Sequence, residues 1–122
     1  MKTILIVDDF AAMRKTLGVI LEGNGYRTLH ADRADNALTL LDDPAFAPDL
    51  VLADFRLPDK NGFELLHAIR HRSPMPEVPV VFMSADKDPV RQFREVGLSS
   101  PAWVRKPVNP ELLISKIQRM LI

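Results

Sequence analysis

Short, mostly apolar runs alternate along this chain with longer segments whose apolar residues recur every three or four positions. Most of the short runs are continuously apolar and rich in β-branched residues, which is typical of strands buried on both faces of a parallel sheet. They predict strands at Thr3–Val7, Tyr26–His30, Leu50–Ala53, Val80–Met83 and Ala102–Val104. The longer segments predict helices at Ala11–Glu22, Arg33–Leu41, Gly62–Arg70 and Pro89–Val96, and from Asn109 to the chain end.

This regular alternation of strand and helix predicts an α/β domain. Consecutive βα units give a parallel sheet with right-handed crossovers and helices on both faces. The length of 122 residues suits a single domain, which we expect to span residues 1–122. In such sheets the functional crevice lies outside the carboxyl ends of the strands. The residues that leave each strand are therefore the first place to look for chemistry.

The charge and composition of the chain exclude several classes of protein. Its 16 basic and 16 acidic residues cancel, so nothing favours a nucleic-acid or membrane surface, which needs a clustered basic excess. The absence of cysteine excludes disulfides, thiolate catalysis and cysteine-ligated zinc. No apolar stretch approaches the length of a membrane span or a signal peptide. We expect a cytoplasmic protein with no direct nucleic-acid or membrane partner.

Polar side chains follow the predicted strands at their carboxyl ends. Asp8 and Asp9 leave the first strand, Asp54 the third, Ser84 the fourth, and Lys106 lies just beyond the fifth. Three carboxylates brought to one edge of a sheet repel each other and become stable together beside a cation. Oxygen ligands without histidine or cysteine favour Mg²⁺. The sequence therefore predicts a magnesium site at this edge.

These residues resemble those of the receiver domains of two-component response regulators. The resemblance rests on Asp8-Asp9, Asp54, Ser84 and Lys106-Pro107 at this spacing. Val7–Phe10 with Met13-Arg14, and Leu57-Pro58 with Gly62, are similar to single-domain chemotaxis-type receivers. It covers Thr3 to Leu121 and implies one doubly wound, flavodoxin-like (βα)5 domain with a five-stranded parallel sheet in the order 2-1-3-4-5. The similarity to chemotaxis-type receivers favours a stand-alone receiver over one excised from a larger regulator.

The resemblance also implies a metal site and a cofactor, Mg²⁺. Asp9 would ligate the ion directly, and Asp8 would hold one of its waters. Asp54 would contribute its carboxylate and Arg56 its backbone carbonyl. Lys106-Pro107 is often joined by a cis peptide bond in this family.

The implied function is a signalling phosphoacceptor. Asp54 would take a phosphoryl group from the phosphohistidine of a sensor histidine kinase or a phosphotransfer protein, with Mg²⁺ bound. Lys106 would pair with the phosphoryl oxygens, and Ser84 would donate a hydrogen bond to one of them. Ser84 and Trp103 would act as the switch that alters the face formed by the fourth helix, fifth strand and fifth helix for an unknown downstream target. Such a protein catalyses only its own phosphorylation and dephosphorylation, and is not otherwise an enzyme.

Three other functions stay open at this point. A magnesium-dependent phosphatase of the haloacid dehalogenase type needs a second acid two residues after its nucleophile, where this chain has Arg56. A flavodoxin needs a hydroxyl-rich phosphate loop after the first strand, where this chain has Asp8-Asp9-Phe10. A pseudo-receiver that only binds partners would not need the complete acceptor set.

Overall fold

The protein contains a five-stranded sheet in which every neighbouring pair of strands is parallel. A computed structural model describes residues 1–72, 77–85 and 102–121. The strands are β1 (Thr3–Val7), β2 (Arg27–Ala31), β3 (Leu50–Asp54), β4 (Val80–Ser84) and β5 (Ala102–Arg105). Their order is β2-β1-β3-β4-β5, which confirms the predicted order 2-1-3-4-5.

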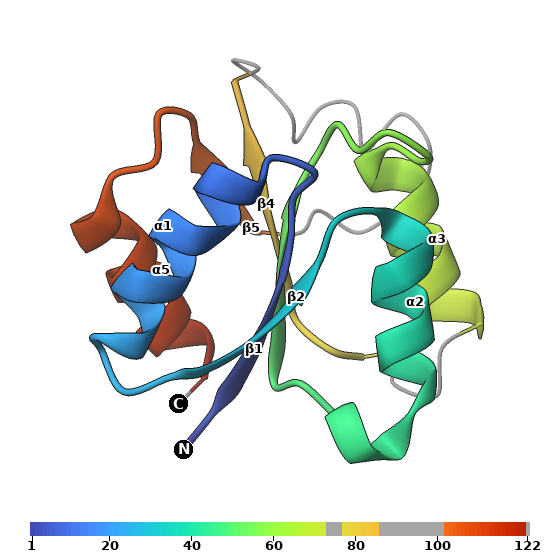
Figure 1. Ribbon diagram of the computed structural model, residues 1–122, viewed down its shortest axis with the longest axis horizontal. Helices are drawn as coiled ribbons and strands as arrows, with labels where there is room; N and C mark the ends of the chain where they lie inside the picture. The colour runs from blue at the N-terminus through green and yellow to red at the C-terminus, as the bar shows by residue number, and fades with distance from the viewer. Residues whose placement is uncertain (73–76, 86–101, 122) are drawn as a thin grey trace.

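Helices cover both faces of this sheet, as predicted. They are α1 (Ala11–Glu22), α2 (Ala34–Asp42), α3 (Gly62–Arg72) and α5 (Pro110–Met120), with a short 3-10 helix η1 at Pro44–Phe46. Figure 1 shows α1 and α5 on one face and α2 and α3 on the other. The helix predicted at Pro89–Val96 lies outside the described residues. Within the described part, no helix combines the length and the apolar character that a membrane crossing requires.

The sheet separates two hydrophobic cores. One contains Leu5 and Val7 of β1 with apolar residues of α2 and α3, and the other contains Ile4 and Ile6 with those of α1 and α5. Successive residues of a strand point to opposite faces, so a strand covered on both sides must be apolar at every position. All four of these β1 side chains are fully buried. This double burial explains the continuous apolar runs of the sequence.

The boundaries differ from the predicted ones by one or two residues. The central strand β3, its neighbour β4 and the edge strand β5 each continue one residue further, to Asp54, Ser84 and Arg105. The second strand and second helix are both shifted one residue toward the carboxyl end, and α3 runs two residues longer. The start of α5 is as predicted: Asn109 caps it by accepting a hydrogen bond from the Leu112 amide at 3.1 Å.

Candidate functional site

The polar residues predicted at the strand exits meet at one edge of the sheet. Asp8 and Asp9 follow β1, and Asp54 ends the neighbouring β3, so that one carboxylate oxygen from each of the three lies within 4.8 Å of the others. Lys106 follows β5, and its Nζ donates to Oδ2 of Asp54 at 2.8 Å. Ser84 is the buried last residue of β4, and its backbone carbonyl accepts the backbone N–H of Lys106 at 2.9 Å. The sheet thus brings three carboxylates and one ammonium to one place.

Asp8 is the most buried member of this cluster, with 1% of its surface exposed. Its Oδ1 accepts the Phe10 amide at 2.9 Å, whereas Oδ2 is buried without a hydrogen-bond partner among the described residues. Burial raises the pKa of the Asp8 carboxyl, and the charges of Asp54 and Asp9 raise it further, against the lowering effect of the Phe10 amide and of Lys106. A buried oxygen without a partner, beside two more carboxylates, fits a bound cation.

The exit of β1 is fixed by backbone contacts that the sequence did not reveal. The backbone amide of Asp8 donates to the Ala31 carbonyl at 3.1 Å, and Nη1 of Arg14 on α1 donates to the Asp8 carbonyl. These two bonds hold the backbone of Asp8 between β2 and the first turn of α1. The orientation of its carboxylate therefore does not depend on its own side-chain contacts alone.

The loop after β3 turns back tightly around the third carboxylate. Oδ1 of Asp54 accepts the Arg56 amide at 3.2 Å. A turn bond from the Leu57 amide to the Lys60 carbonyl, at 3.2 Å, and an antiparallel bridge between Arg56 and Asn61 close the loop. The backbone of Arg56, predicted to supply a carbonyl ligand, is thus held next to Asp54.

Asp59, which lies in the loop after β3, caps the amino end of α2, a helix that comes earlier in the chain. Its two oxygens accept the backbone amides of Ala34 and Asp35, each at 2.9 Å. Partial desolvation alone would raise the pKa of Asp59, but the bonds from these two amides outweigh it and lower the pKa. The loop beside Asp54 is therefore tied to the amino end of α2.

Residues 4–118 match the response regulator receiver domain family. The chain belongs to this family. The predicted resemblance and the flavodoxin-like fold are both confirmed.

Three relatives show how far this similarity extends. This receiver is 34% identical to the DNA-binding response regulator MtrA of Mycobacterium leprae, over 97% of this chain and 50% of the relative. It is 30% identical to the phosphate regulon transcriptional regulatory protein PhoB of Pseudomonas aeruginosa, over 98% of this chain and 52% of the relative. The structure of the chemotaxis response regulator CheY4 of Vibrio cholerae superposes with a TM-score of 0.86 at 28% identity, covering 99% of both chains. The chain spans about half the length of the curated relatives it matches first.

Two further features of the receiver lie directly around Lys106 and Asp54. The Lys106–Pro107 peptide bond is cis, as the resemblance implied. Phe55, which follows Asp54, packs edge-on against Phe82 and lies 5.6 Å from Trp103, ring centre to ring centre. Trp103 also lies 5.7 Å from Phe82 and packs against the core on the α2–α3 face. The aromatic predicted to take part in switching is therefore packed inward beside the acidic site.

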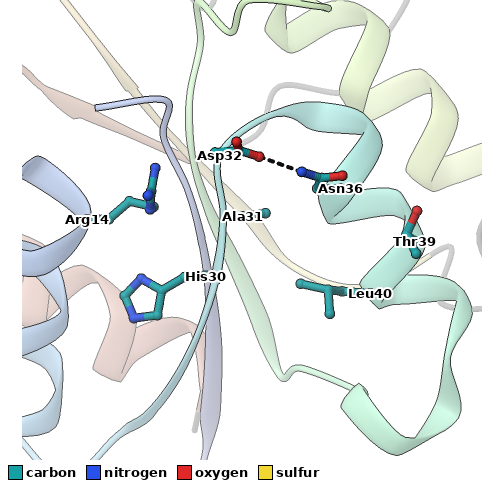
Figure 2. A pocket seen from close by; sticks show the side chains of 7 residues that line it. All are labelled: Arg14, His30, Ala31, Asp32, Asn36, Thr39 and Leu40. Carbon is teal, nitrogen blue, oxygen red and sulfur yellow. Dashed lines mark hydrogen bonds between the residues drawn. The ribbon is translucent and has the colours of Figure 1, made fainter. Parts of the chain in front are cut away.

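A pocket of about 430 Å³, with both polar and apolar lining residues, lies along β2. Figure 2 shows Arg14 and His30 on one side of the strand and Asp32, with its hydrogen-bonded partner Asn36, on the other. Burial lowers the pKa of His30, and the nearby charge of Arg14 lowers it further. Arg14 thus lines this pocket and also bonds to the Asp8 carbonyl.

Proposed function

We propose that residues 1–122 form one receiver domain whose Asp54 accepts a phosphoryl group from the phosphohistidine of a sensor histidine kinase or a phosphotransfer protein. The observation that carries this proposal is the geometry around Asp54. Its carboxylate is nearly buried, lies within 4.8 Å of the other two carboxylates and receives the Lys106 ammonium at 2.8 Å. Phosphoryl transfer depends on positioning and on charge neutralisation, and this arrangement supplies both.

The donor set fits Mg²⁺. Asp8, Asp9, Asp54 and the backbone carbonyl of Arg56 would hold the ion, because hard oxygen ligands suit it and the cluster carries excess negative charge. When bound, the ion neutralises the carboxylates and the phosphoryl oxygens, which favours approach of an anionic donor to an anionic acceptor. The buried Oδ2 of Asp8 would then gain a partner through a metal-bound water.

In the proposed step, a carboxylate oxygen of Asp54 attacks phosphorus as the bond between phosphorus and the imidazole nitrogen breaks. The imidazole keeps the electron pair of that bond and takes up a proton. Lys106 moves its ammonium from the carboxylate of Asp54 to a phosphoryl oxygen, which preserves its ion pair in the product. Ser84, one residue beyond the Asp54–Met83 register pair on the adjacent strand, donates its hydroxyl to another phosphoryl oxygen. Its movement, together with Trp103, would alter the face around β5 and α5 for a downstream target.

The donor protein would dock beside this site, along α1. A mainly apolar groove of about 530 Å³ runs there, with Met13 and Ile20 of α1 on one wall and Pro107 and Val108 on the other. Phe10, at the start of α1, is 66% exposed next to Asp9. An apolar surface adjoining the acceptor suits the partner that must bring its phosphohistidine within reach of Asp54.

Labelling with acetyl phosphate tests the acceptor. We expect intact-protein mass spectrometry to show one added phosphoryl group on the wild type with Mg²⁺, and none with a chelator or in Asp54→Asn. Asp42→Asn is the matched control, because Asp42 is an exposed acid at the end of α2. Wild-type labelling of Asp54→Asn would show that another residue is the acceptor. An unlabelled wild type that still binds Mg²⁺ would favour a pseudo-receiver that only binds partners.

A further inference from the structure

Two of the three histidines of the chain lie next to each other on α3. His67 and His71 are four positions apart, and side chains at this spacing are neighbours on the same face of a helix. Their imidazole rings lie 4.3 Å apart, centre to centre, with an angle of 38° between the ring planes. The helix therefore holds two nitrogen-bearing rings side by side.

The opposite face of α3 fixes where these rings lie. Leu65 and Ile69 are fully buried in the core that α3 shares with α2, and this packing turns the other face of the helix toward solvent. His67 and His71 are both exposed on that outer face. Because the backbone is held while the rings are exposed, each ring can rotate until one of its nitrogens faces a shared ligand.

Neither ring is engaged elsewhere in the part of the chain that the structure describes. There, His67 and His71 contact each other but have no hydrogen bond or ion pair. His30, the third histidine, differs in this respect. Its Nε2 lies 3.2 Å from Oγ1 of Thr28, and its ring lies against Gly18 of α1. The α3 pair thus keeps its nitrogens available for coordination.

The number and kind of ligands indicate which ions the pair would take. Glu64 lies on the same face one turn before His67, but its Oε1 accepts the Asn61 amide at 3.1 Å. Among the described residues, no third histidine or acid brings a ligand atom to the pair. Imidazole nitrogen suits Ni²⁺, Cu²⁺ and Zn²⁺, whereas Mg²⁺ prefers oxygen ligands. The pair therefore differs in metal preference from the acidic cluster of Asp8, Asp9 and Asp54.

We propose that His67 and His71 together bind a divalent transition-metal ion of the class Ni²⁺, Cu²⁺ and Zn²⁺. One nitrogen of each ring would coordinate the ion, and water would fill its remaining positions. Both ligands belong to one helix, so binding to the first brings the second within reach at a high effective concentration. The ion would link successive turns of α3 and stabilise the folded state. This inference does not rest on the proposed role of Asp54.

A nickel titration of the chain without an affinity tag tests the site. Ni²⁺ binding is measured by isothermal titration calorimetry in excess Mg²⁺, which competes for the acidic cluster. His67→Gln and His71→Gln each remove one ligand from an exposed position. His30→Gln is the matched control, because it removes the only other histidine of the chain. Paramagnetic broadening of amide and imidazole signals by Ni²⁺ then locates the bound ion.

We expect the wild type and His30→Gln to bind Ni²⁺ equally well at the pair, with broadening centred on α3. His67→Gln and His71→Gln should each lose roughly tenfold or more in affinity, because a two-ligand site becomes a one-ligand site. The double variant should lose little more than either single one, since each substitution already abolishes the chelate. Ni²⁺ should also raise the Tm of the wild type more than that of either single variant.

Three results would each overturn the proposal. Equal Ni²⁺ affinity of the wild type, His67→Gln and His71→Gln would show that the pair is not a site. Broadening centred on Asp8 and Asp9, with the α3 signals unchanged, would place the ion in the acidic cluster. An equal loss of binding in His30→Gln would assign the ion to another histidine. Acetyl phosphate labelling is measured separately, so failure of either proposal leaves the other standing.

Discussion

Replacing Asp8 by asparagine removes one of the three clustered carboxylates and keeps the shape of the side chain. The asparagine Oδ1 still accepts the Phe10 amide, which Asp8 binds at 2.9 Å. Without metal, we expect the variant to be more stable than the wild type, because the carboxylates lie within 4.8 Å of one another. At that separation and an effective dielectric constant of about 20, two like charges repel by about 3.5 kcal/mol.

The net gain should be smaller than this figure. Asp8 faces both Asp54 and Asp9, but the Lys106 ammonium lies 2.8 Å from Asp54 and offsets part of the repulsion. We therefore expect a net stabilisation of about 2 kcal/mol at pH 7.5 in EDTA. For a domain of this size it corresponds to a rise in Tm of roughly 5–10 °C. Asp42→Asn, outside the cluster, should leave Tm nearly unchanged.

The pH dependence gives this prediction a definite sign. The pKa of Asp8 is raised above its ordinary value of 3.8 in the folded protein. The folded state therefore binds its proton more readily than the unfolded chain does. The ionised carboxylate of Asp8 therefore lowers the free energy of unfolding. This loss of stability is fully present above the raised pKa and disappears as the pH falls toward 3.8. The stability advantage of Asp8→Asn in EDTA should accordingly shrink as the pH is lowered.

Differential scanning fluorimetry with EDTA and with Mg²⁺ measures both effects. Mg²⁺ should raise the Tm of the wild type, because ligands that bind only the folded state stabilise it. It should raise the Tm of Asp8→Asn less, since a tenfold weaker affinity costs about 1.4 kcal/mol of that stabilisation at saturating metal. Two results together would refute this reasoning: a lower Tm for Asp8→Asn than for the wild type in EDTA, and an equal Mg²⁺-induced rise in Tm for both proteins. They would show that the carboxylates do not destabilise one another and that Asp8 does not help to bind the ion.

Three further substitutions test the surroundings of the site. Asp59→Ala should destabilise the protein by about 1 kcal/mol in urea titrations, because it removes the cap of α2, whereas Asp42→Ala should not. Gly62→Ala should destabilise the protein by about 2 kcal/mol or more in the same titrations, because its Cβ would lie 2.2 Å from a ring carbon of Phe55. Lys106→Ala should still be labelled by acetyl phosphate, though more slowly, and amide shifts upon labelling should no longer reach β5. Wild-type shifts there would show that Lys106 does not transmit the change.

The sequence predicted β1, β3 and β4 well because these inner strands are apolar on both faces. It placed the ends of β3, β4 and β5 one residue early, since Asp54, Ser84 and Arg105 are polar and a hydrophobic pattern stops before them. Backbone pairing in the ladder does not depend on apolar side chains, so the strands continue through these residues. Asp54 and Ser84 therefore belong to the sheet, whereas Asp8, Asp9 and Lys106 lie in the segments that follow their strands.

Other features of the site could not be read from the chain. Asp59 follows a proline and is typical of a turn, yet it caps a helix that begins 25 positions earlier. Arg14 bonds to the carbonyl of Asp8 through a side chain whose spacing shows only an amphipathic helix. Each of these contacts depends on tertiary structure and leaves no periodic signal.

The division of the interior into two cores has a consequence for how this domain tolerates change. Leu41 of α2 and Ile117 of α5 are both buried, but they belong to different clusters on opposite faces of the sheet. Substitutions that share no packing partner affect stability independently. The face that carries α2 and the face that carries α5 can therefore accumulate mutations separately. Partner surfaces on one side of the receiver can diverge while the packing on the other side stays as it was.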